Sequence, residues 1–128
     1  MKIERNFTKA GQDAYADLDF VTTVSEIRNP DGSVVFKLDN VEVPKSWSQV
    51  ASDVIAQKYF RKAGIPRRLR SQKEKNIPDW LQPSVVDQAK LSRMDTETRY
   101  GPETDSRQVF HRLAGGWAYW GQKYGYFN

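Results

Sequence analysis

Cysteine is absent from this chain of 128 residues, and histidine occurs once. Without cysteine the chain can form no disulfide, thiolate metal site, cysteine nucleophile or thiyl radical of its own. Long apolar runs are absent too, since no stretch approaches the ~18 residues of a membrane-spanning helix. The start, Met1 to Asn6, lacks the apolar segment of a secretory signal. We therefore expect no membrane partner and a cytoplasmic location.

Residues that could carry catalysis or bind a metal are few and scattered. The single imidazole, His111, has no cysteine or second histidine to join, which leaves a general base or a residue at a helix edge as its interpretations. Asp17 and Asp19, near Asp13, would share one face of a strand, as a carboxylate pair or as solvated charges. No glycine-rich phosphate loop is visible. We predict no catalytic, cofactor-binding or metal-binding residue in this chain.

Basic residues concentrate between residues 61 and 75, in a chain with a formal net charge of +4. Arginine forks suit phosphate oxygens, so the candidate phosphate-binding residues are Arg67, Arg68, Arg70 and Lys73. The alternative is a solvated loop, partly paired with Glu74 and Asp79. A small module that binds nucleic acid or nucleotides through this stretch is the second functional hypothesis. Aromatic residues at stacking spacing are missing, which speaks against single-stranded nucleic acid.

Two alternating segments predict a β-hairpin. Apolar and polar residues alternate from Asp17 to Ser25, with a bulge or register change near Ser25, and alternate again from Val34 to Asp39. Between them, Asn29-Pro30-Asp31-Gly32 is a turn sequence, because proline fixes φ and Gly32 tolerates positive φ. A further short strand is expected at 41–43. Two strands alone are marginal in water, so a helix should cover them.

The main helices are expected at about 47–62 and 106–120. The first has an apolar stripe from Trp47 to Ile55, Ser46 as N-cap and Gly64 beyond its end. The second begins with a capping box at Asp105 and Gln108, and its stripe from Val109 to Ala118 is expected to be buried. Between the helices lies an irregular, proline-containing connector, with one turn at 78–81 held to the core by Trp80 and Leu81 and a short helix within 84–93. The sequence thus predicts a single α+β domain over 1–128, with a small antiparallel sheet packed against two main helices.

Aromatic residues gather at the end of the chain. The candidate docking surface consists of Trp117, Trp120, Tyr124, Tyr126 and Phe127. So much ring surface at a terminus is typical of contact with another polypeptide. The alternative is that the rings fold back on the sheet. A free-standing scaffold that recognises another protein through this end is the third functional hypothesis.

Four stretches carry a family resemblance: 8–12, 25–36, 47–66 and 108–127. They resemble the extreme N-terminal region of bacterial adenosylcobalamin-dependent, or class II, ribonucleotide reductases. In that family adenosylcobalamin generates a thiyl radical inside an α/β barrel, and ribonucleotides are reduced to deoxyribonucleotides for DNA synthesis. The resemblance implies the domain that precedes the barrel. The radical cysteine, the redox cysteines and the cobalamin- and substrate-binding parts lie outside these residues.

The resemblance therefore implies a detached N-terminal domain without reductase activity of its own. Its partner would be the remainder of the reductase polypeptide, with a homodimer as a further expectation, and its role structural, docking or regulatory. We expect adenosylcobalamin in the full enzyme and no cofactor on this chain.

Overall fold

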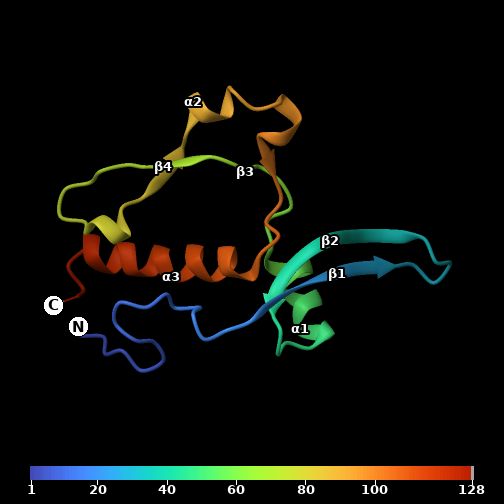
Figure 1. The fold of residues 1–128 in the computed structure, drawn as a ribbon, viewed down its shortest axis with the longest axis horizontal. Helices are drawn as coiled ribbons and strands as arrows, with labels where there is room; N and C mark the ends of the chain where they lie inside the picture. The colour runs from blue at the N-terminus through green and yellow to red at the C-terminus, as the bar shows by residue number, and fades with distance from the viewer. Residues whose placement is uncertain (128) are drawn as a thin grey trace.

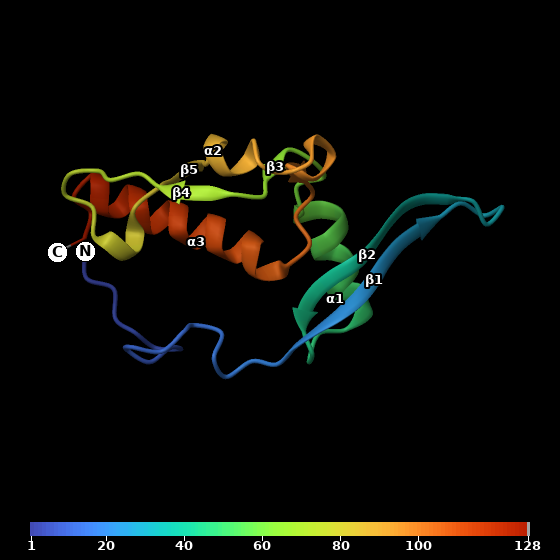
Figure 2. The same cartoon turned by 45° about the horizontal axis from the view of Figure 1, so that its top comes forward.

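The computed structural model describes residues 1–127, and its first main feature is the expected hairpin. Strands β1 (Phe20–Arg28) and β2 (Val34–Pro44) pair antiparallel, and the chain reverses where the amide of Gly32 donates to the carbonyl of Asn29 at 2.9 Å. Gly32 adopts φ 88°, as the turn sequence predicts. The hairpin projects away from the rest of the molecule, its tip far from both termini (Figures 1 and 2).

The register of the hairpin shifts between Thr23 and Ser25, so the bulge expected near Ser25 is confirmed. The expectation of a separate short strand at 41–43 is wrong, because β2 continues through these residues to Pro44. A bulge interrupts the pairing locally and lets the strand bend, and the pairing resumes on either side of it.

The first helix is shorter than the sequence suggests, and its last turn is π-helical. Helix α1 (Gln49–Val54) continues as the π-helical turn η1 (Ile55–Tyr59). Its N-cap is Ser48, not Ser46, and the Ser48 hydroxyl accepts from the amide of Ala51 at 3.2 Å. The helix ends at Phe60, which is extended.

The cations and glycine expected at the helix end lie beyond it. Lys62 still serves as a cap, because its ammonium donates to the carbonyls of Ala56 and Gln57 at 2.9 and 3.0 Å. Gly64 has φ +79° but sits in the following loop rather than at the first position after the helix.

The connector forms an arch over the second main helix (Figure 1). Its elements are β3 (Ile65–Pro66), β4 (Leu69–Ser71), the 3-10 turn η2 (Asp79–Leu81), β5 (Ser84–Val86), α2 (Gln88–Leu91), the 3-10 turn η3 (Thr96–Thr98) and β6 (Tyr100–Gly101). Strand β3 pairs with β6 and β4 with β5, both antiparallel. The turn at 78–81 is present, but Trp80 is 79% exposed, so the expectation that it holds the turn to the core is wrong.

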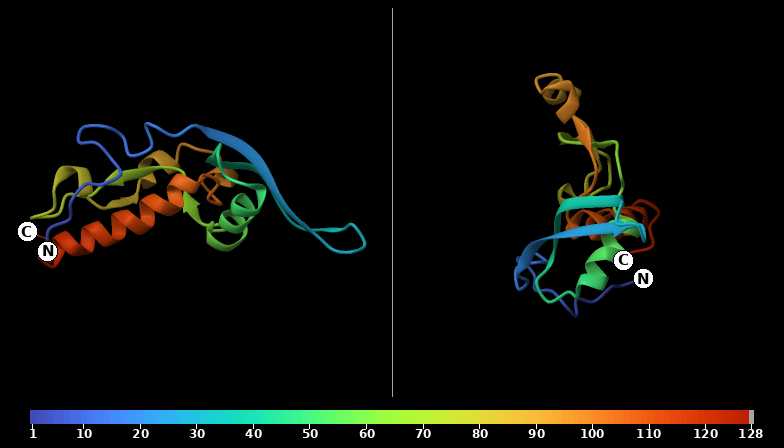
Figure 3. Two further views of the ribbon diagram at one scale, coloured as in Figure 1. Left: turned by 90° about the horizontal axis from the view of Figure 1, so that it is seen from below. Right: turned by 90° about the vertical axis from the view of Figure 1, so that its right-hand side faces the viewer.

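Helix α3 (Ser106–Lys123) is the longest element, and its capping box is confirmed. The side chain of Asp105 accepts from the amide of Arg107 at 2.9 Å, while the side chain of Gln108 accepts from the amide of Asp105 at 3.0 Å. Both chain termini lie at the C-terminal end of α3, away from the hairpin (Figure 3). No helix of residues 1–127 is long and apolar enough to cross a membrane.

The core lies where the base of the hairpin, α1 with η1 and the start of α3 meet. Its buried residues are Val41, Val43, Ile55, Ala56, Phe60 and Val109. This arrangement is α+β, with small antiparallel sheets and two main helices, as the sequence predicts. Val109 is the one residue of α3 among the buried core residues, so most of that helix lies outside the core.

Candidate docking surface

The apolar stripe of α3 is largely open, which corrects the expectation that it is buried. Val109 is 2% exposed, but Phe110 is 41%, Trp117 65% and Trp120 57% exposed. The expected docking residues Tyr124 and Tyr126, beyond the helix, are exposed as well. The rings therefore do not fold back on the sheet, since α3 meets the sheet only at its own start.

Phe127 is the exception among the candidate docking residues. Its ring lies against Gly121, where an added Cβ would collide with it. The absence of a side chain at Gly121 thus lets the chain end fold over the helix.

An apolar groove, hereafter the terminal groove, runs along this end of α3. It measures about 500 Å³ and is lined in part by Ile3, Ala114, Trp117, Trp120, Tyr126 and Phe127. The amino group of Met1 donates to the carbonyl of Tyr126 at 2.6 Å, which brings the two ends of the chain together beside the groove. The structure thus joins four of the five candidate docking residues in one place, and Tyr124 lies just outside it.

The polar side of α3 faces the connector, which explains why the apolar side is turned outward. The hydroxyl of Tyr119 donates to Glu74 at 2.7 Å, and the ammonium of Lys123 donates to the Tyr119 hydroxyl at 2.8 Å. These donors, Tyr119 first, hold the pKa of Glu74 below its ordinary value. A polar cluster therefore ties the far end of the arch to the helix.

The near end of the arch is tied by a second ion pair. Arg112 of α3 lies 3.1 Å from the carboxylate of Glu103, whose side chain is 4% exposed. The same carboxylate accepts from the amide of Arg61 at 2.8 Å, and Arg112 donates to the carbonyl of Tyr59 at 2.6 Å. A buried carboxylate is tolerated here because it is paired and hydrogen-bonded.

A second apolar groove lies between α1 and α3, and it was not predicted from the sequence. This α1–α3 groove measures about 450 Å³. Its walls include Trp47, Ala51, Val54 and Ile55 on one side and Phe110 and Leu113 on the other. The rings of Trp47 and Phe110 meet edge to face, with centroids 6.1 Å apart. The sequence signal that could have predicted this groove is the apolar stripe of the first helix. The structure leaves Val54 of that stripe 48% exposed.

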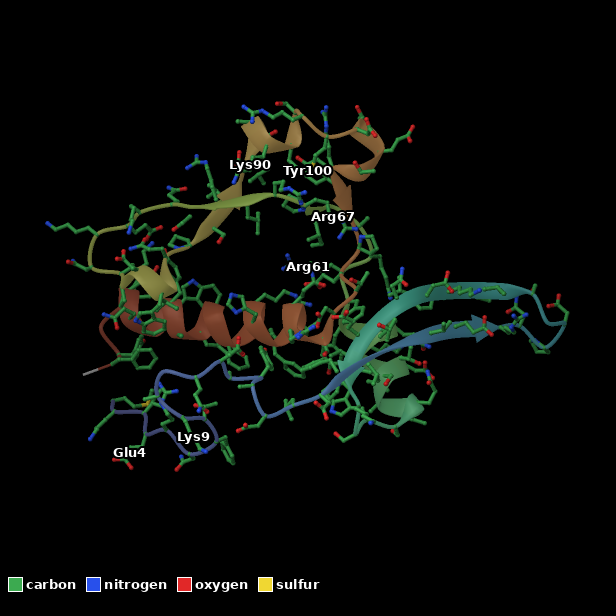
Figure 4. All side chains as sticks on the ribbon, in the orientation of Figure 1. Glu4, Lys9, Arg61, Arg67, Lys90 and Tyr100 are labelled. Carbon is green, nitrogen blue, oxygen red and sulfur yellow. The ribbon has the colours of Figure 1, made fainter. Side chains whose placement is uncertain are left out.

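The candidate phosphate-binding residues are exposed but do not converge on either groove. Lys73 pairs with Asp79, as the solvated-loop interpretation predicts, whereas Glu74 pairs with Lys123. Arg68 donates to the carbonyl of Arg67 at 2.8 Å. Arg67 lies against Gly101, and Figure 4 shows it near the labelled Tyr100.

The residues with catalytic potential remain apart. His111 is exposed on α3, while Asp17 and Asp19 line a separate pocket with Pro44 and Lys45. Across residues 1–127 no three histidine, cysteine or carboxylate side chains gather to hold a metal ion. These positions define no common chemistry.

The fold and its surface define a small α+β unit with an open apolar side. The family model of class II vitamin B12-dependent ribonucleotide reductase matches residues 21–128. The chain therefore belongs to this family, and the resemblance seen in the sequence is confirmed.

Two curated relatives support the assignment along the whole chain. The vitamin B12-dependent ribonucleotide reductase of Bradyrhizobium diazoefficiens is 61% identical over all 128 residues, and that of Agrobacterium fabrum is 57% identical over the same span. The chain spans about 10% of the length of each, at the N-terminal end.

The described residues do not fit adenosylcobalamin, the cofactor that the family implies. A corrinoid carries amide arms that need polar partners, whereas the two large grooves are lined by aliphatic and aromatic side chains. The one imidazole, His111, belongs to neither groove lining. No role in cobalamin chemistry is therefore assigned to a residue of this chain.

Proposed function

We propose that residues 1–128 form a single, non-catalytic domain of a vitamin B12-dependent ribonucleotide reductase, and that the terminal groove docks this domain onto the rest of the enzyme. The enzyme would reduce ribonucleotides to deoxyribonucleotides in the cytoplasm, with the chemistry on the parts that this chain lacks. The observation that carries the proposal is the exposure of Trp117 and Trp120 on a helix whose polar side is already satisfied.

The exposed rings are large enough to matter energetically. Each tryptophan retains roughly 100 Å² or more of apolar surface, which is worth about 2–3 kcal/mol when it is removed from water. Tryptophan and tyrosine are also the residues most often found at the energetic centres of interfaces. A surface of this kind is suited to a permanent neighbour.

The relatives offer a neighbour of sufficient size. About nine-tenths of their length lies outside the part that this chain matches. We propose that the main partner is this remainder, and that a homodimer of the complete enzyme would form through it.

The test is to mix the chain with the separately expressed remainder and titrate complex formation. The Trp117→Ala/Trp120→Ala double variant should bind at least about 30-fold more weakly, because the loss of even one interface hot spot costs about 2 kcal/mol or more. Val35→Ala is the matched control, since Val35 is 60% exposed on the projecting hairpin, outside the groove. Equal affinity of the double variant and the control would refute docking through this surface.

A further inference from the structure

The α1–α3 groove is open because α1 turns its polar side to the hairpin. The side-chain amide of Gln49 donates to the carbonyl of Val24 at 2.9 Å, and Asp53 accepts from the fully buried Ser25 at 2.8 Å. Gln57, one turn further, donates to Ser25 at 3.2 Å. These contacts fix which side of α1 faces inward.

The opposite side of α1 is apolar and lacks a complete cover. Val54 is 48% exposed while its neighbour Ile55 is buried, so the stripe passes from the core into the open groove. Between α1 and α3 lies a furrow into which a third helix can pack, with its axis about 8–10 Å from the axes of the other two helices. The aliphatic floor and the aromatic end wall of Trp47 and Phe110 match the apolar side of an amphipathic helix.

We infer that the α1–α3 groove receives an amphipathic helix from the rest of the reductase polypeptide. This inference rests on the proposed function and adds a second contact to it, at the other end of α3. The incoming helix would carry apolar residues at i, i+3 or i+4, and i+7 to contact both walls.

Continuity with the terminal groove favours the same polypeptide over a second copy of this chain. Phe110, Leu113, Trp117 and Trp120 follow one another at helical spacing along α3 and link the two grooves. The 18-residue helix is ~27 Å long, so a domain-sized neighbour seated at one groove reaches the other. A tethered partner also has an effective concentration in the millimolar range, which favours a second contact.

Cysteine labelling in the complete reductase tests the inference, because this chain has no cysteine of its own. Single variants Val54→Cys, Val50→Cys and Ala114→Cys are made in an enzyme with a protease site after residue 128. A maleimide is added to the native enzyme, and the label is counted on the released 1–128 fragment. Urea-denatured enzyme gives the unprotected rate for each position.

Val54→Cys should label at least about tenfold more slowly in the native enzyme, because a covered thiol is out of reach of the reagent. Val50→Cys is the matched control: Val50 is 73% exposed on the same helix, and the structure places it outside the groove lining. It should label at nearly the denatured rate. Val50 lies one turn before Val54 on the helix surface, so protection at both positions would mean that the cover extends beyond the groove lining, which contradicts a helix seated in the groove.

Ala114→Cys reports on the terminal groove and separates the two proposals. Protection at Ala114 with free labelling at Val54 would overturn this inference and leave the proposed function intact. Free labelling at both would overturn both. Protection at Val54 that disappears when the enzyme is diluted to monomers would identify a second copy as the occupant and contradict the inference.

Discussion

The hydroxyl of Ser25 donates to the carboxylate of Asp53 at 2.8 Å and joins the hairpin to the first helix. Ser25 is fully buried at the register shift of β1. This bond orients α1: its polar side meets the strand, and its apolar side is left for the α1–α3 groove. The exposed apolar surface is thus a consequence of specific contacts rather than of loose packing.

Removing this bond should lower stability. Ser25→Ala leaves the carboxylate of Asp53 without its buried donor, which should reduce the free energy of unfolding by about 1–3 kcal/mol. Urea unfolding of the variant measures the change. Val50→Ala, on the exposed side of the same helix, should change it by less than about 0.5 kcal/mol. Equal, small effects at both positions would show that the hairpin does not orient α1.

The Tyr119 contact should make stability depend on pH in the acid range. The pKa of Glu74 is lowered in the folded chain, chiefly by the Tyr119 hydroxyl. A lowered carboxyl pKa stabilises the fold above the unfolded value of about 4.3, and this contribution disappears as pH falls through the lower folded value. Tyr119→Phe should therefore lose stability at pH 7 and show a flatter loss below about pH 5. Urea unfolding at several pH values measures both effects. If the free energy of unfolding changes with pH in the same way for the native chain and for Tyr119→Phe, Tyr119 is not what lowers the pKa of Glu74.

Gly115 and Gly116 give a prediction of opposite sign. A glycine inside a helix is often explained by another backbone that packs closely on it, yet among residues 1–127 nothing within 4 Å would meet a Cβ at either position. Replacing each by alanine should stabilise α3 by about 0.5–1 kcal/mol, because glycine is the poorer helix former. Thermal unfolding of the single variants checks this. A loss of stability would show that another part of the chain does approach the glycines.

Isolated from the remainder, the chain should neither reduce ribonucleotides nor hold adenosylcobalamin. The reason is chemical: the chain has no cysteine to carry a thiyl radical, and its large grooves are lined by apolar side chains. Titration with adenosylcobalamin, followed by its visible absorption, measures this directly. Saturation at micromolar cofactor would overturn the assignment of the chemistry to other parts of the enzyme.

Local signals in the sequence predicted much of the fold. Asn29 to Gly32 specified the hairpin turn, and Asp105 with Gln108 specified the start of α3, because both depend on neighbouring residues alone. The ladders β3–β6 and β4–β5 were missed, since two or three residues leave no period to read. The exposure of Trp117 and Val54 could not be decided from the sequence, for another reason. An apolar stripe predicts that a helix face is buried, but it does not tell whether the residues that bury it belong to this chain or to another part of the protein.

The heat-capacity change on binding the separate remainder tests the central claim most directly. Burial of apolar surface gives a negative change in heat capacity, which is the most reliable mark of this kind of contact. Calorimetric titration at several temperatures should show a clearly negative value for the native chain and a smaller one for the Trp117→Ala/Trp120→Ala variant. A value near zero for the native chain, with binding that weakens steeply as salt is added, would show a charged contact instead and contradict the account.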